Sequence, residues 1–119
     1  VDYQIKMKIN KREFLDSLDR ATLLIKDSDK KPIRLSIDDR TLGLKISSLI
    51  GSLNEEIDIE KEGNNLVIGF NPKLIIDALR VIDDENVTIY FNNTKSPCVI
   101  KDDAETYIYL ILPMGINEE

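Results

Sequence analysis

The sequence predicts an α+β domain in which a strand, helix and three strands occur twice. Residues 66–79 read LVIGFNPKLIIDAL, which is typical of a strand followed by a helix. This stretch has a double upstream at a constant offset, so the domain is predicted to be a duplication. The matched positions are Met7, Ile9, Asn10, Phe14, Leu15, Asp16 and Leu18 against Ile68, Phe70, Asn71, Ile75, Ile76, Asp77 and Leu79.

The composition predicts one globular domain covering residues 1–119, with repeats at about 1–61 and 62–116. The 119 residues are 42% hydrophobic and 32% charged, which does not indicate disorder. No apolar run approaches the length of a membrane helix and no signal-peptide pattern is seen, so a cytoplasmic location is expected. Because the chain opens at Val1 directly into a strand pattern, we expect it to be a piece of a larger protein.

Charge and cysteine content restrict the possible functions. With one cysteine, Cys98, and no histidine, an internal disulfide is excluded and a zinc site is disfavoured. The formal net charge is −6 and the pI is near 4.7, so the domain as a whole should repel nucleic acid. Any role on DNA must therefore be local or topological.

The first repeat is predicted to form a strand, a helix and three strands. Residues 3–9 alternate between apolar and polar side chains, as in a strand with one solvated face. Asn10 is a suitable N-cap and Glu13 completes a capping-box pattern, so a helix is expected to about Ile25. Strands are expected at 33–37, 42–46 and 56–60, whereas 49–54 has no clear pattern.

The second repeat follows the same order. After the strand at 66–70, Asn71 is an N-cap and Pro72 occupies the first helical position of a helix to about Ile82. Strands are expected at 87–91, 98–100 and 107–112. Two such units can place their helices side by side under antiparallel sheets and bury both apolar stripes in one core.

The two repeats differ in their fourth strands. Alignment by pattern places Ile108 and Leu110 where the first repeat carries the outward-facing Asp58 and Glu60. The last strand is therefore apolar on both faces. Either a neighbouring domain covers it, or it belongs to an exposed apolar groove that binds a peptide or partner segment.

Three features resemble one protein family. They are the GFN-x(5)-DAL element at 69–79, the ending YLILPMGI at 109–116 and the doubled unit. Together they resemble the third, C-terminal domain of the bacterial DNA polymerase III beta subunit, the sliding clamp. The resemblance implies a DNA-clamp fold, with three such domains in a subunit and two subunits in a ring around duplex DNA. The isolated domain is expected to be monomeric.

The resemblance implies a non-catalytic processivity factor without a cofactor. Its partners would be the DNA polymerase III alpha subunit, the clamp loader and other proteins that carry a clamp-binding motif. This motif, with a glutamine and a hydrophobic end, would bind in a groove between the second and third domains. The groove residues that the resemblance implies here are Asn71, Leu74, Lys95, Pro97, Leu110, Ile111, Leu112, Pro113, Met114 and Ile116.

The resemblance also implies that both helices face the central hole of the ring. Basic helix residues would then make loose, sequence-independent contacts with DNA phosphates. These candidates are Lys11, Arg12, Arg20, Lys73 and Arg80. Without the resemblance, the same residues are equally well explained as an ordinary solvated helix face, because Asp16, Asp19 and Asp77 lie beside them.

Two other functions are compatible with parts of the sequence. Carboxylates at Asp38, Asp39 and residues 83–85 could hold a metal in an enzyme, but no phosphate-binding loop or nucleophile motif accompanies them. A free-standing peptide-binding adaptor would keep the apolar groove without needing basic helices. Further copies of the unit upstream in the gene would favour the ring over the adaptor.

Overall fold

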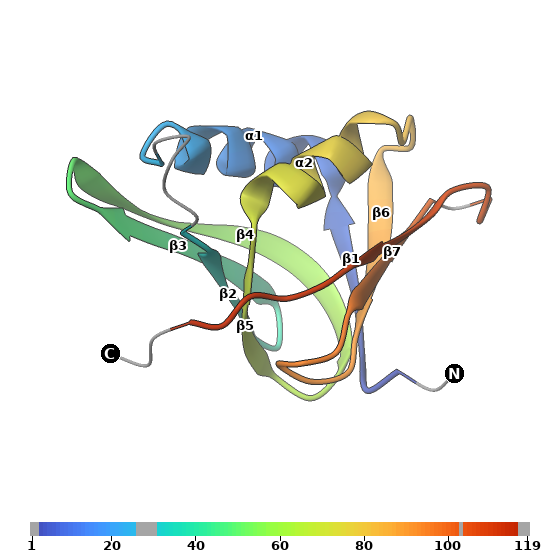
Figure 1. Cartoon of the computed structure of the whole chain (residues 1–119). Helices are drawn as coiled ribbons and strands as arrows, with labels where there is room; N and C mark the ends of the chain where they lie inside the picture. Colours follow the sequence, from blue (N-terminus) through green and yellow to red (C-terminus); the bar gives the residue numbers. More distant parts are fainter. Residues whose placement is uncertain (1–2, 26–30, 103, 117–119) are drawn as a thin grey trace.

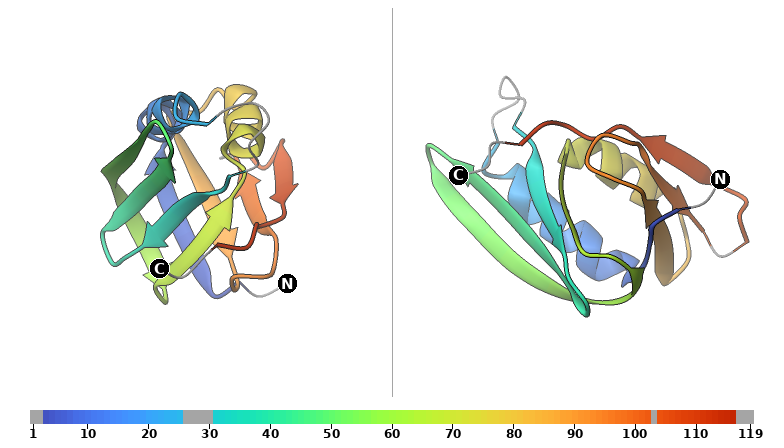
Figure 2. Two further views of the ribbon diagram at one scale, coloured as in Figure 1. Left: turned by 60° about the vertical axis from the view of Figure 1, so that its left-hand side comes forward. Right: turned by 90° about the horizontal axis from the view of Figure 1, so that it is seen from below.

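Two helices lie side by side against a curled antiparallel sheet in the computed structural model, which describes residues 3–25, 31–102 and 104–116 (Figure 1). Seen from below, the strands lie around the helices on several sides (Figure 2). The elements are β1 (Ile5–Asn10), α1 (Lys11–Thr22), β2 (Ile33–Ile37), β3 (Thr41–Ser48), β4 (Gly51–Gly63), β5 (Leu66–Phe70), α2 (Pro72–Arg80), β6 (Asn86–Phe91), β7 (Cys98–Lys101) and β8 (Ile108–Ile111). The predicted α+β class, with paired helices and antiparallel strands, is confirmed.

The two repeats exchange their first strands. The spatial order is β5-β2-β3-β4-β1-β6-β7-β8, so β5 of the second repeat pairs with β2 of the first. In the same way β1 pairs with β6 as well as with β4 of its own repeat. Neither repeat can therefore complete its sheet alone, which makes the duplication one cooperative unit.

The core lies between the sheet and the two helices. Phe14 and Leu18 of α1 and Leu79 of α2 are completely buried. Phe70 and Phe91, from strands of the second repeat, meet with ring centroids 6.3 Å apart. Burying one such side chain contributes about 1.5 to 3 kcal/mol, so the shared core is the main source of stability.

Both helices begin at the predicted N-caps but end earlier than predicted. The Asn10 side chain accepts a hydrogen bond from the Glu13 amide at 2.9 Å. The first helix ends at Thr22 and not at Ile25, because the following amides bond three residues back, as in Ile25 N to Thr22 O at 3.2 Å. The second helix likewise ends at Arg80, since the Ile82 amide bonds Leu79 O at 3.2 Å.

Six strands have bounds that differ from the prediction. β3, β6 and β7 extend one or two residues further at one or both ends, and β1, β4 and β8 differ for reasons of pairing. β1 starts at Ile5, where its pairing with β4 and β6 begins. β4 runs over Gly51–Gly63, because its pairing with β3 continues as far as Gly51 opposite Ser48. This pairing extends through residues in which apolar and polar side chains do not alternate. β8 covers only Ile108–Ile111, since β7 offers it four partners.

The ladders also correct the alignment of the two repeats on their fourth strands. In β3 and β4, Lys45 pairs with Asn54, and the matching pair in β7 and β8 is Val99 with Leu110. By the same register Ile108 corresponds to Ser52, so neither residue replaces Asp58 or Glu60 as predicted. The alignment by pattern failed because β4 is longer than β8. The corrected alignment still places apolar side chains on the outer face of β8 where β4 carries polar ones.

Candidate interaction surfaces

The second repeat leaves open a seam that the first repeat closes. In the first repeat β1 and β4 pair over five positions, from Ile5 opposite Gly63 to Ile9 opposite Ile59. The equivalent contact in the second repeat is one bridge, Gly69 to Met114, in which the Met114 amide donates to Gly69 O at 2.8 Å. Pro113 has no amide hydrogen with which to extend this ladder.

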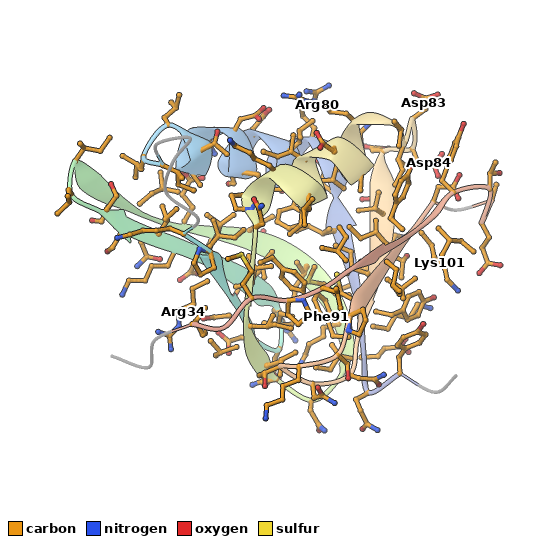
Figure 3. The ribbon with its side chains drawn as sticks, in the orientation of Figure 1. Arg34, Arg80, Asp83, Asp84, Phe91 and Lys101 are labelled. Carbon is orange, nitrogen blue, oxygen red and sulfur yellow. The ribbon has the colours of Figure 1, made fainter. Side chains whose placement is uncertain are left out.

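A cleft lies beside this single bridge. We call it the seam cleft; it has a volume of about 640 Å³. It is lined by Arg34, Val67, Ile68, Gly69, Thr94, Lys95, Met114, Gly115 and Ile116. A hollow of about 420 Å³ adjoins it and shares Arg34, Gly115 and Ile116. Figure 3 shows Arg34 below the C-terminal segment, residues 112–116, which crosses in front of β5.

Gly69 allows the C-terminal segment to lie close against β5. A Cβ atom at this position would overlap the Ile116 side chain and stand 2.9 Å from the Met114 carbonyl oxygen. Both neighbours belong to the segment that borders the cleft. A glycine is therefore required here for close approach of two backbones, not for an unusual φ angle.

The outer face of β8 forms an exposed apolar surface. Leu110 and Leu112 are 68% and 66% exposed, and Leu74 on the neighbouring α2 is 47% exposed. Ile111, between the two leucines in sequence, is only 6% exposed and packs in the core. The last strand is thus apolar on both faces, and in this chain one of those faces is open.

The ten groove residues implied by the family resemblance surround this region. Three of them, Lys95, Met114 and Ile116, line the seam cleft. The Asn71 side chain accepts from the Lys73 amide at 3.1 Å as the N-cap of α2, so its oxygen is already used. Pro97 and Pro113 are partly exposed, Leu74, Leu110 and Leu112 are exposed, and Ile111 is buried.

Sequence reasoning missed Arg34, Val67 and Thr94 as members of the cleft. Arg34 lies on β2 and Val67 on β5, and these strands become neighbours only through the exchange between repeats. The outward positions of an alternating strand were a usable signal. The sequence pattern did not predict which strands would lie side by side.

The helix face carries basic side chains that mostly have acidic partners. Arg80 projects from α2 away from the sheet, and its guanidinium lies 3.6 Å from Asp19 of α1 (Figure 3). Arg12 lies 3.9 Å from Asp16 one turn along α1. These exposed pairs are weak and can exchange partners, because water and salt screen them.

Arg20 and Lys11 are bound more firmly. Arg20 Nε donates to Glu55 Oε2 at 2.7 Å, and Ser17 Oγ donates to the other carboxylate oxygen at 2.6 Å. The hydrogen bond from Arg20, assisted by that from Ser17, lowers the pKa of Glu55 to about 2. Lys11 Nζ donates to the carbonyl of Ile82 and so caps the end of α2. Lys73, in the first turn of α2, also has an interaction partner.

The candidate metal ligands and the single thiol are the groups that bear on a possible catalytic site in the described residues. Among them, no group of three or more Asp, Glu, Cys or His side chains gathers closely enough to hold a metal ion. Asp39 instead lies 3.5 Å from Lys61 Nζ. Burial raises the pKa of the Cys98 thiol to about 12, so it remains protonated at neutral pH. Within the same residues, no helix has the length and apolar character needed to cross a membrane.

Comparison with known proteins gives one consistent result. Residues 1–115 match the family described as DNA polymerase III beta subunit, C-terminal domain. The beta sliding clamp of Staphylococcus aureus is 39% identical over 118 residues, covering 95% of this chain and 31% of its own length. This chain therefore spans about a third of the curated relatives that it matches.

Solved structures agree with this match. A putative DNA polymerase III beta subunit from Eubacterium rectale superposes with a TM-score of 0.93 at 60% identity, over 95% of this chain and 31% of that one. The DNA polymerase sliding clamp from Bacillus subtilis gives 0.91 at 31% identity, over 98% and 32%. In both cases the aligned part is a fraction of a longer protein.

Proposed function

This chain belongs to the family formed by the C-terminal domain of the DNA polymerase III beta subunit, and from that membership we propose that it forms part of a DNA sliding clamp. The observation that carries the proposal is the family match over nearly the whole chain. In this role the domain is a non-catalytic part of a processivity factor that works in the cytoplasm. It binds no cofactor.

The partner site of this domain is the outer face of β8 with the first turn of α2. The exposure of Leu74, Leu110 and Leu112 supports this assignment, because contiguous apolar surface on a domain usually marks an interface. Clamp-binding motifs of the polymerase alpha subunit, the clamp loader and other partners dock their hydrophobic end here. A preceding domain of the same subunit supplies the second wall of the groove.

The opposite end of the domain takes part in closing the ring as a homodimer. A second set of exposed apolar side chains supports this, namely Leu23 after α1 with Leu49 and Ile50 between β3 and β4. The end of α1 and the turn between β3 and β4 lie at the end of the molecule away from the last strand (Figure 1). The helices then face encircled duplex DNA, and Arg12, Lys73 and Arg80 contact its phosphates through water.

Peptide titration tests the partner site. In the full-length protein that includes this chain, Leu110→Ala and Met114→Ala should each weaken binding of a polymerase C-terminal peptide by about tenfold, as expected for central apolar anchors. Val81→Ala is the matched control, because Val81 is a 46% exposed apolar residue at the other end of α2. Unchanged affinity in both groove variants would refute the site.

Replication assays test the helix face separately. Lys73→Glu combined with Arg80→Glu should shorten DNA synthesis per loading event at moderate salt, because it reverses two charges that face the duplex. Peptide affinity should remain that of the parent protein. Equal processivity of variant and parent would show that these side chains do not face DNA.

A further inference from the structure

The outer face of the sheet carries adjacent basic side chains next to the seam cleft. Arg34 on β2 lies directly opposite Lys45 on β3, and its neighbour on the other side is Gly69. The next residue across the sheet from Lys45 is Asn54. The strands on either side of this basic pair therefore supply no carboxylate at the paired positions.

This arrangement opposes the rules of strand pairing. Like charges directly opposite each other destabilise a ladder. Within the described part of the chain, neither Arg34 nor Lys45 takes part in an ion pair. The chain carries a net charge of −6, so the pair does not reflect a generally basic surface. An uncompensated local cost of this kind is typical of a functional site.

The two hollows extend the basic surface on both sides of this pair. Lys95 joins Arg34 in the seam cleft, and Lys31 joins Arg34 and Lys45 in the adjoining hollow. No described acidic side chain lines either one. Val67, 38% exposed, gives the floor of the seam cleft an apolar part. The lining thus combines positive charge with apolar contact.

This chemistry fits an acidic peptide better than a nucleic acid strand. Proteins that hold single strands rely on aromatic side chains for stacking bases, and no aromatic residue lines either hollow among the described residues. An arginine guanidinium binds a carboxylate through two parallel hydrogen bonds. Backbone and aliphatic groups around it suit an extended peptide.

We propose that the basic surface of Arg34, Lys45 and Lys95 binds acidic residues that flank the groove-binding motif of a partner protein. The proposal depends on the proposed partner site and adds a second contact to it. Met114 and Ile116 are groove residues implied by the family resemblance, they follow β8 directly in the chain, and they line the seam cleft, so a bound peptide reaches the cleft within a few residues. Acidic residues next to the motif would bind the basic surface, so partners with similar apolar motifs are distinguished by the charge of their flanking residues.

Peptide pairs test this assignment in the full-length protein that includes this chain. One peptide carries the motif with three glutamates added at its amino or carboxyl end, and its partner carries three glutamines there. At low salt the glutamate form should bind about five- to tenfold more tightly at one of the two ends, and the difference should shrink as salt increases.

Matched variants assign the effect to the basic surface. Arg34→Gln with Lys45→Gln should abolish the advantage of the glutamate flank while leaving the glutamine-flanked peptide unaffected. Lys6→Gln with Lys8→Gln removes the same charge from β1, away from the cleft, and should preserve the advantage. Since the first pair removes like-charge repulsion, its thermal midpoint should stay equal or rise.

The outcomes separate this inference from the proposed function. If both peptides bind normally but the glutamates add nothing at either end, the basic surface does not bind an acidic flank. If the motif itself fails to bind, the partner site is wrong. An oligothymidylate probe gives a further outcome: loss of its binding in the Arg34→Gln, Lys45→Gln variant, with the glutamate advantage intact, would overturn the acidic-peptide assignment in favour of phosphates.

Discussion

The β1–β4 seam and the seam between β5 and the C-terminal segment occupy equivalent places in the two repeats, but only the first is closed. Five pairs join β1 to β4, whereas a single bridge joins Gly69 to Met114. The closed seam makes a continuous sheet. The open seam leaves a cleft lined by apolar and basic side chains. One repeated unit therefore forms a continuous sheet in one place and leaves a hollow in the equivalent place.

The two seams also differ in the residues at matching places. Lys61, opposite Met7 in the closed seam, has a side chain only 3% exposed that donates to Gly63 O at 3.0 Å and contacts Asp39. If the ladder continued past the Gly69 bridge, Gly115 would occupy the equivalent place, and no atom lies within 4 Å of where its Cβ would be. Lys61 thus ties the end of β4 to the turn between β2 and β3, whereas Gly115 has no side chain for such a contact.

The largest expected effect separates the buried last residue of β8 from the exposed residue that follows it. Ile111→Ala should lower the free energy of unfolding by about 2 to 4 kcal/mol, because it removes a buried side chain from the core. Leu112→Ala, at an exposed neighbouring position, should change it by less than about 0.5 kcal/mol. Urea unfolding measures both. Similar losses in the two variants would mean that the outer face of β8 is not free.

Close packing at the single bridge gives the next effect. Gly69→Ala should destabilise the domain by about 1 to 3 kcal/mol and weaken motif-peptide binding, because the new methyl group displaces the C-terminal segment. Gly43→Ala is the matched control, since its Cβ would meet the Ser36 Cβ at an ordinary 3.5 Å. Equal stability of the two variants would show that the bridge contributes little.

The contacts of Lys61 at the end of β4 give the next effect. Lys61→Met keeps the aliphatic stem but removes the hydrogen bonds to Gly63 and Asn65 and the contact with Asp39. The free energy of unfolding should fall by about 1 to 2 kcal/mol, because the hydrogen-bonded ammonium is buried but its carboxylate partner Asp39 is largely exposed. Hydrogen exchange should become faster at the end of β4 and in the turn that follows it, and should stay the same at β7 and β8. Uniform protection would argue against a local fastening.

The smallest effect is electrostatic and depends on pH. Glu55 on β4 lies opposite Leu44 on β3. The equivalent pair in the second repeat is Ile111 on β8 opposite Cys98 on β7, so an acidic residue in the first repeat corresponds to a buried apolar one in the second. The folded state lowers the pKa of Glu55 from 4.5 to about 2, so its stabilisation is complete above about pH 4.5 and is lost as pH falls toward 2. Glu55→Gln should cost about 1 kcal/mol at neutral pH, after allowance for solvent screening.

The control for this prediction is the pH profile itself. Over the window from about 4.5 to 2, the parent should lose more stability than the Glu55→Gln variant, as followed by thermal unfolding. Parallel profiles would mean that the Arg20 pair does not stabilise the folded state. The helix face would then be freer to contact DNA than its geometry suggests.

The sequence by itself determined the elements and most of the core. Asn10 and Asn71 marked both helix starts, and the alternation of apolar residues located the strands, because capping and burial are local requirements on side chains. The repeat also predicted correctly that the second half carries apolar outward positions that are polar in the first. Helix ends were predicted too late, because the last amides bond three residues back. Strand lengths were less accurate, since they depend on how many partners the neighbouring strand offers.

Only the tertiary structure decided which strands lie side by side. The exchange of β1 and β5 between repeats brings Arg34 beside Gly69 and forms the seam cleft, and no local pattern encodes a pairing between strands so distant in sequence. The hydrogen-bond partner of Arg20 is equally distant in sequence, because Glu55 lies on β4. Local chemistry thus specified what each segment becomes, whereas long-range pairing specified where the open surface lies.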